Sequence, residues 1–264
     1  KPFTLEASAT KAKLPEPAIP IMVRGLPQSK APITDIHRFW EQTGNFYARG
    51  MGNDNLTDPF IGLGVMPASS ALFRDMTAIR FEHPEWIAEN CTACGKCNTV
   101  CPDTALPGLV NEVGQVLDTV VRRVKKQGHK IEHLPRAVRT LESHLHEALS
   151  AAPETASVTG LIEDAIDATL AETANEETRV ALEREFELFT GALDGFQFAL
   201  SRPYFTVPEK TEAGSGGLFT IAVDPYTCKG CGECIAVCED DALRSVPQTP
   251  DTVAGLREQV HPRR

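Results

Sequence analysis

The sequence has no cysteine over most of its length: all eight cysteines lie between residues 91 and 101 or between residues 228 and 238. A secreted disulfide scaffold is usually small, with its cysteines spread along the chain. The clustering therefore argues against disulfides and indicates thiols that bind metal in a reducing cytoplasm. No ninth cysteine is left to act as a catalytic nucleophile.

Other signatures are missing as well. No apolar run approaches the length of a membrane span, and nothing has the pattern of a signal peptide, so we expect a soluble, cytoplasmic protein. The net charge of −10 disfavours nucleic acid as a partner, because phosphate contacts need clustered Lys and Arg. Because the first residue is Lys1 and not Met, we expect a trimmed chain or a piece of a longer one.

Motifs for other chemistry are also lacking. There is no phosphate-binding or dinucleotide-binding loop and no serine-triad signature. The seven histidines are scattered. His144 and His146 are two apart on a predicted helix and cannot share a metal-binding face, so we expect them to be solvated.

What the sequence does have is one cysteine motif, written twice. The runs NCTACGKCNTVCPD (90–103) and TCKGCGECIAVCEDD (227–241) both read C-x2-C-x2-C-x3-C. Residues 91–106 align without gaps on residues 228–243, so the runs are an internal repeat. Three cysteines at this spacing can surround one iron–sulfur cube. In two-cluster bacterial ferredoxins the fourth cysteine ligates the other cluster.

The spacing therefore predicts two [4Fe–4S] clusters with crossed ligands. The first cluster is assigned to Cys91, Cys94, Cys97 and Cys238, and the second to Cys228, Cys231, Cys234 and Cys101. Structural zinc is the alternative. Zinc ligands usually come as two separated pairs, and a triplet followed by a lone fourth cysteine fits that pattern poorly.

Residues beside the cysteines should tune such clusters. Gly95, Gly230 and Gly232 allow the backbone to bend around a cube and to direct N–H groups at sulfur. The acidic residues 239–241 follow Cys238 and should lie near the first cluster, where negative charge would lower its potential. A solvated acidic turn with screened charges is an equal alternative.

Residues 1–75 predict an extended, Pro-rich N-terminal arm, with Lys11–Ala31 as its extended part. One short helix is expected from Thr34 to Tyr47, and a loop from Gly50 to Gly64. Short strands are expected at Met76–Phe81 and Phe219–Val223, each leading into a cysteine run. The remaining segments are the two halves of a ferredoxin-like domain (76–110 and 203–246), a helical insert (111–202) and a C-terminal tail (247–264).

Apolar residues at helical spacing predict four helices within the insert, each needing a neighbour for its apolar stripe. The stripes cover residues 113–124, 134–149, 158–166 and 182–200. The first two helices are basic and the last two acidic on their outer faces. Solvated faces are expected, since attraction between exposed charges contributes little. The predicted fold class is thus α+β: a dicluster bacterial-ferredoxin-like module with a large α-helical insert and an extended arm.

The cysteine runs and their flanks resemble a known family. The segment PEWI (84–87) shortly before ENCTACGKCNTVCPDTAL, with the later FTIAVDPYTCKGCGECIAVC, is similar to the iron–sulfur region of pyruvate:ferredoxin oxidoreductase and its 2-oxoacid relatives. The resemblance covers about residues 76–106 and 218–243. Glu239 departs from it, because the family's pattern has proline after the fourth cysteine.

The resemblance implies an electron-relay subunit or segment of a 2-oxoacid:ferredoxin oxidoreductase. Electrons would come from a thiamine diphosphate-dependent site and leave to ferredoxin or flavodoxin. Thiamine diphosphate, Mg and coenzyme A are expected in partner subunits or domains that bind thiamine and the 2-oxoacid. This chain shows no thiamine signature, so no carbon-chemistry active site is expected within it.

Three other functions stay open. Dicluster modules are widely reused, so the chain could be the iron–sulfur subunit of an unrelated redox complex. It could also be a free-standing ferredoxin, although a long N-terminal arm has no use in a free carrier. The third is a structural metal module whose insert binds a partner. The sequence leaves the 2-oxoacid, the acceptor, the direction of turnover and the oligomeric state undetermined.

Overall fold

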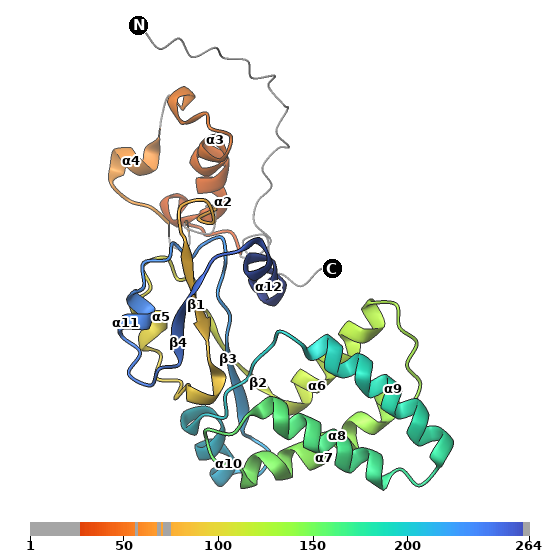
Figure 1. Ribbon diagram of the computed structural model, residues 1–264. Coiled ribbons are helices and arrows are strands. Elements are labelled where there is room, and N and C mark those ends of the chain that lie inside the picture. Colours follow the sequence, from red (N-terminus) through yellow and green to blue (C-terminus); the bar gives the residue numbers. More distant parts are fainter. Residues whose placement is uncertain (1–26, 56–57, 68–69, 71–74, 261–264) are drawn as a thin grey trace, which may run out of the picture. The chain divides into compact units, whose positions relative to one another are not determined.

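The computed structural model describes residues 27–55, 58–67, 70 and 75–260. The chain divides into two compact units, Lys1–Asp75 and Met76–Arg264. Helices and two small antiparallel sheets make the fold α+β, as predicted (Figure 1). The extended segment expected at Lys11–Ala31 lies mostly outside the described residues. Within the described residues, no helix has the length and apolar character needed to cross a membrane.

The first unit contains the helix that was expected at 34–47. It runs as α2 (Ile36–Phe39), a π-helical turn (Trp40–Gly44) and α3 (Asn45–Ala48), after a 3-10 turn at Pro32–Thr34. Asp35 begins α2, because its carboxylate accepts the N–H of Arg38 at 2.7 Å. This helix is confirmed.

The loop expected at Gly50–Gly64 is wrong in part, because it contains a 3-10 turn (Gly52–Asp54) and α4 (Pro59–Leu63). Asp58 caps α4 by accepting the N–H groups of Phe60 and Ile61, each at 3.0 Å. The Phe60 ring meets Phe39 edge to face at 5.1 Å. A good N-cap and one aromatic contact thus form a helix that apolar periodicity does not reveal.

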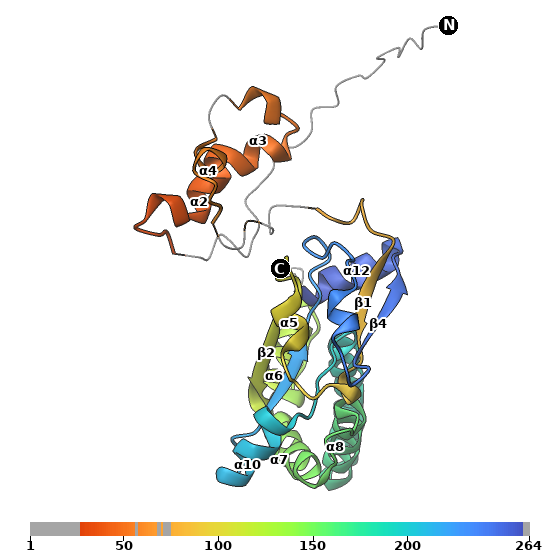
Figure 2. The ribbon, with the colours of Figure 1, turned by 90° about the vertical axis from the view of Figure 1, so that its left-hand side faces the viewer.

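The strands of the second unit pair across a long sequence distance. β1 (Glu82–Trp86) is antiparallel to β4 (Leu243–Pro247), and β2 (Gly108–Glu112) is antiparallel to β3 (Gly217–Ile221) (Figures 1 and 2). Each half of the repeat runs strand, cysteine run, short helix, strand. The short helices are α5 (Lys96–Val100) and α11 (Glu233–Ala236), and they contact each other. Crossed strand pairing thus joins both halves of the repeat in one body.

The strand expected at Met76–Phe81 is wrong. These residues form a turn, and β1 begins only at Glu82. Its partner β4 ends at Pro247, opposite Glu82, and α12 (Pro250–Val260) begins soon after. Within the described part of the chain, neither sheet has a strand that pairs with 76–81. The strand expected at Phe219–Val223 is observed two residues earlier, as β3.

The four helices of the insert are confirmed. They are α6 (Val113–Lys126), α7 (Leu134–Ala151), α8 (Val158–Glu172) and α9 (Glu176–Leu193). Their apolar stripes form one core, separate from the core around the cysteines. The four helices lie together on one side of the β2–β3 pair in Figure 1.

The fourth apolar stripe is longer than its helix. α9 ends at Leu193, and Gly195 follows with a φ of +81°, which an L-residue with a side chain rarely adopts. Phe198 and Leu200 are nevertheless buried, because Ala199 pairs with Phe219 of β3 through two backbone hydrogen bonds. The insert therefore returns directly to the sheet.

A buried carboxylate joins two helices of the insert. Glu185 of α9 accepts the backbone N–H groups of Glu132, His133 and Leu134 at 2.8, 3.1 and 2.6 Å. These donors lie at the N-terminus of α7, where backbone N–H groups lack partners within the helix. Glu185 thus caps α7 from a neighbouring helix.

The exposed charges of the insert pair locally. Arg139 of α7 contacts Asp118 of α6 and Glu142 of its own helix, and not the acidic helices. Across α7 and α8, His144 Nε2 lies 3.3 Å from a carboxylate oxygen of Glu172. His144 and His146 are half-buried, so the expectation that both are solvated is wrong.

Three further helical segments complete the second unit. A 3-10 turn (Ala88–Asn90) leads into the first cysteine run, and a π-helical turn (Arg202–Thr206) and α10 (Val207–Thr211) precede β3. The segment expected as a C-terminal tail contains α12, whose Leu256 is buried in the same core as the cysteine runs.

Candidate functional site

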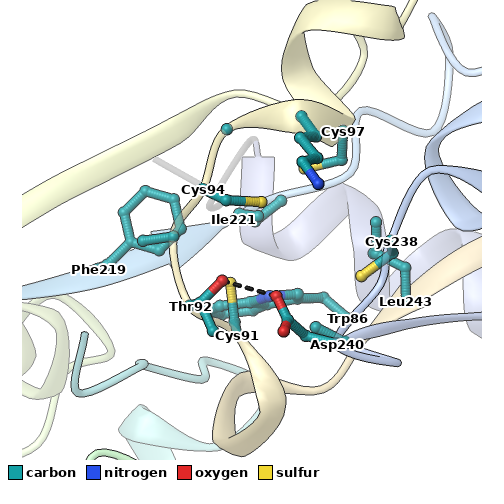
Figure 3. A pocket seen from close by; sticks show the side chains of 14 residues that line it. Trp86, Cys91, Thr92, Cys94, Cys97, Phe219, Ile221, Cys238, Asp240 and Leu243 are labelled. Carbon is teal, nitrogen blue, oxygen red and sulfur yellow. Dashed lines mark hydrogen bonds between the residues drawn. The ribbon is translucent and has the colours of Figure 1, made fainter. Parts of the chain in front are cut away.

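The eight cysteines line two cavities, four in each. Trp86, Phe219 and Ile221 line the first one, which encloses about 360 Å³, including space open to solvent. Its cysteines are Cys91, Cys94, Cys97 and Cys238. Their sulfur atoms point toward a common space in Figure 3. Three thiols of the first run and one of the second thus meet in one place.

The second cavity repeats this arrangement with the runs exchanged. It encloses about 300 Å³ and is lined by Pro84, Leu106 and the pair Asp103 and Lys229. Its cysteines are Cys228, Cys231, Cys234 and Cys101. Both sets of four are the sets expected from the spacing, so the structure brings together each group of cysteines that the sequence assigned to one cluster.

The loops between the cysteines depend on unusual backbone conformations. Gly95 and Gly232 occupy equivalent places before α5 and α11, with φ of +75° and +78°. Gly230 has a φ of +71°, and a Cβ there would lie 2.7 Å from the carbonyl oxygen of Glu82. Only glycine meets both requirements, so Gly230 is needed for β1 to lie against the second run. Ala93 adopts a φ of +56° in the first run.

Arg80 is a buried side chain that hydrogen-bonds to the backbone at the start of the second cysteine run. Its guanidinium donates to the carbonyl oxygens of Pro225 and Cys228, and its Nε donates to Gln248 at 2.6 Å. The residue is 5% exposed. The turn at 76–81 that replaces the expected strand is therefore what places this side chain beneath the loop.

Burial disfavours the charged form of four of the cysteine thiols. It raises the pKa of Cys91, Cys97 and Cys228, and it raises the pKa of Cys234 to about 12. Such thiols stay protonated at neutral pH unless a metal displaces the proton. Burial thus disfavours a free thiolate at these four cysteines.

Several N–H groups face the sulfur atoms. The backbone N–H of Ala105 donates to Cys101 Sγ at 3.2 Å. Backbone N–H groups of Ala93, Asn98 and Gly230 lower the pKa of Cys91, Cys97 and Cys228 against the larger effect of burial. Such donors stabilise negative charge on ligand sulfur.

The acidic residues after Cys238 do not form a bare negative patch. Glu239 forms an exposed ion pair with Lys96 at 2.8 Å, and Asp240 accepts the Thr92 hydroxyl at 2.7 Å. Asp240 lines the first cavity, as expected, whereas Glu239 is absent from its lining. The second cavity has an ion pair of its own, between Lys229 and Asp103 at 3.2 Å.

A single zinc ion and a four-iron cluster need different spacings of their four thiols. Among residues 27–55, 58–67, 70 and 75–260, no group of three or more His, Cys, Asp or Glu side chains is arranged to hold one ion. A tetrahedral zinc bound by four thiolates at 2.3 Å would hold the sulfurs about 3.8 Å apart. In a four-iron cluster each thiolate binds its own iron, so the sulfurs lie further apart. The donor set and the loop shape are compatible with that arrangement.

Sequence reasoning missed Trp86, Phe219 and Ile221 as residues of the first cavity. Phe219 and Ile221 are two apart on β3, so they share a face of the strand. The sequence shows this two-residue spacing, but only the pairing of β3 with β2 determines which face of the strand contacts the cysteines. Comparison with family models, curated proteins and solved structures finds no match for this chain.

Proposed function

We propose that the chain binds two [4Fe–4S] clusters and relays electrons. The observation that carries the proposal is the crossed grouping of the thiols, since each cavity takes three cysteines from one run and one from the other. Cys91, Cys94, Cys97 and Cys238 would hold the first cluster. Cys228, Cys231, Cys234 and Cys101 would hold the second. When bound, such clusters supply one-electron redox chemistry.

The residues around the thiols suit this role. Cys94 and Cys231 are exposed, so each cavity reaches the surface through one cysteine, while Cys228 and Cys234 are buried. N–H donors at the ligand sulfurs would stabilise the added negative charge of a reduced cluster. Structural zinc is the competing assignment, but its ligands usually come as two separated pairs, unlike a triplet followed by a lone fourth cysteine.

The test is anaerobic reconstitution of the purified chain. Iron and acid-labile sulfide should each approach about eight per chain, as two four-iron clusters require. Reduction with dithionite should give low-temperature EPR signals of reduced clusters. Roughly two zinc ions per chain without acid-labile sulfide would reject the proposal.

We further propose that this relay is the cytoplasmic iron–sulfur part of a 2-oxoacid:ferredoxin oxidoreductase. The support is the resemblance over residues 76–106 and 218–243, where PEWI (84–87) precedes the first run. The carbon chemistry, with thiamine diphosphate, Mg and coenzyme A, would belong to partner subunits or domains. Ferredoxin or flavodoxin would accept the electrons.

The decisive experiment is anoxic purification of the native assembly that contains this chain. Thiamine-binding and 2-oxoacid-binding polypeptides should accompany it. Pyruvate or a related 2-oxoacid, with coenzyme A, should then reduce its clusters without dithionite. If the chain is found with other redox subunits and a 2-oxoacid has no effect, it is the iron–sulfur subunit of an unrelated complex.

A further inference from the structure

Trp86 is fixed at the wall of the first cavity. It is the last residue of β1, pairs with Leu243 of β4 and is 6% exposed. Its ring meets Phe219 edge to face at 6.3 Å. Trp86 lines the first cavity together with Cys91 and Asp240 (Figure 3). The side chain therefore cannot turn away from the cysteines without breaking this packing.

The indole N–H of Trp86 is buried beside the thiols of the first cavity. Trp86 Nε1 is buried and has no hydrogen-bond partner of good geometry within the part of the chain that the structure describes. Trp86 and Cys91 line the same cavity, so the Cys91 sulfur is a nearby acceptor. A buried indole N–H without an acceptor is costly, and Cys91 Sγ is the acceptor that would relieve this cost.

A short, rigid connection sets this geometry. Ile87 donates its backbone N–H to Ala242 at 2.8 Å, and the 3-10 turn Ala88–Asn90 closes with the N–H of Cys91 on Ala88 at 3.0 Å. Trp86 and Cys91 thus belong to one hydrogen-bonded segment. The repeat places Val223, which has no N–H on its side chain, at the equivalent position before the second run.

We propose that Trp86 donates a hydrogen bond from Nε1–H to the Cys91 thiolate and so raises the reduction potential of the first cluster alone. This inference rests on the proposed function. Reduction adds negative charge that spreads onto the ligand sulfurs, and an N–H donor stabilises the reduced form more than the oxidised form. Trp86 acts through Cys91 and is therefore a positioning residue, not a ligand. Val223 gives the second cluster no such donor.

The test compares midpoint potentials of the reconstituted chain in an EPR-monitored redox titration. Trp86→Phe keeps an aromatic ring against Phe219 and removes the N–H. It should lower the potential of one cluster and leave the other unchanged, with full iron and sulfide content. The shifted signal should be the one that Cys91→Ser removes. Phe219→Leu changes packing in the same cavity but keeps the N–H, so it should shift that potential less.

A second variant covers the case in which Trp86→Phe fails to assemble. Trp86→benzothienylalanine replaces the indole N–H by sulfur in a ring of the same shape and should lower the same potential. An unchanged potential in a fully loaded variant would overturn the inference alone. An equal shift in Phe219→Leu, or in both clusters, would also overturn it. A wild-type chain that assembles no cluster would overturn the proposed function together with the inference.

Discussion

At the scale of single residues, Arg80 ties together three parts of the second unit. Its side chain donates to the carbonyl oxygens of Pro225 and Cys228, at the start of the second run, and to the amide oxygen of Gln248. We expect Arg80→Met to destabilise the loaded protein by about 2–4 kcal/mol, because buried carbonyl groups lose a charged donor. The measurement is the midpoint of urea unfolding, monitored by circular dichroism under anoxic conditions.

The control for this prediction is Arg244→Met. Arg244 is exposed and pairs with Glu85 on the neighbouring strand, an interaction that contributes about 0–1 kcal/mol. If both variants shift the urea midpoint equally, Arg80 has no special role in holding the loop.

A second prediction at this scale concerns the crossed ligands. Cys101→Ser and Cys231→Ser should remove the same EPR signal, although these residues belong to different runs, because both line the second cavity. Cys238→Ser and Cys94→Ser should remove the other signal. Each variant should lose roughly half of the about eight iron atoms expected. Pairing of Cys101→Ser with Cys94→Ser instead would show that each run holds its own cluster.

At the scale of helices and strands, the contact between α9 and the N-terminus of α7 depends on one buried side chain, Glu185. Glu185→Ala would leave three backbone N–H groups at the start of α7 without their acceptor. We expect a loss of about 2–4 kcal/mol, and a smaller loss for Glu185→Gln, which keeps an acceptor oxygen. Thermal unfolding of the helical signal measures this loss.

The matched control is Glu187→Ala, two residues along the same helix. Glu187 is exposed, so its removal should change stability by less than about 0.5 kcal/mol. Equal effects of the two alanine variants would mean that the loss comes from α9 itself and not from the cap on α7.

At the scale of the whole second unit, the two cores should respond differently to loss of iron. The insert has its own apolar core, whereas the core around the two cysteine runs includes the cysteines themselves. Chelation of iron from the loaded chain should therefore release amide protection over 91–101 and 228–238. Residues 113–193 should stay protected, because local opening follows the distribution of buried contacts. Hydrogen–deuterium exchange read by mass spectrometry distinguishes this outcome from loss of protection throughout.

The four insert helices could be predicted because they depend on local spacing, and the cysteine grouping because the repeated motif matches a known pattern of crossed ligands. The thiol sets follow from the repeated motif, and the stripes of α6 to α9 have helical period. What local pattern could not give depends on distant partners. Residues 76–81 have strand-like composition but form a turn, and α9 ends at Leu193, before Gly195, although apolar residues continue. Trp86 became part of the site only through the pairing of β1 with β4.

The crossed strand pairing also constrains the order in which the chain can be made. Each proposed ligand set needs cysteines from both runs, so neither can be complete until the second run has left the ribosome. The insert has mostly local contacts and can fold earlier. Its two ends, at Glu112 and Ala199, both adjoin β3. Folding of the insert therefore shortens the open loop between the runs and lowers the entropy lost when they meet. We therefore expect the folded insert to favour the meeting of the two cysteine runs during synthesis.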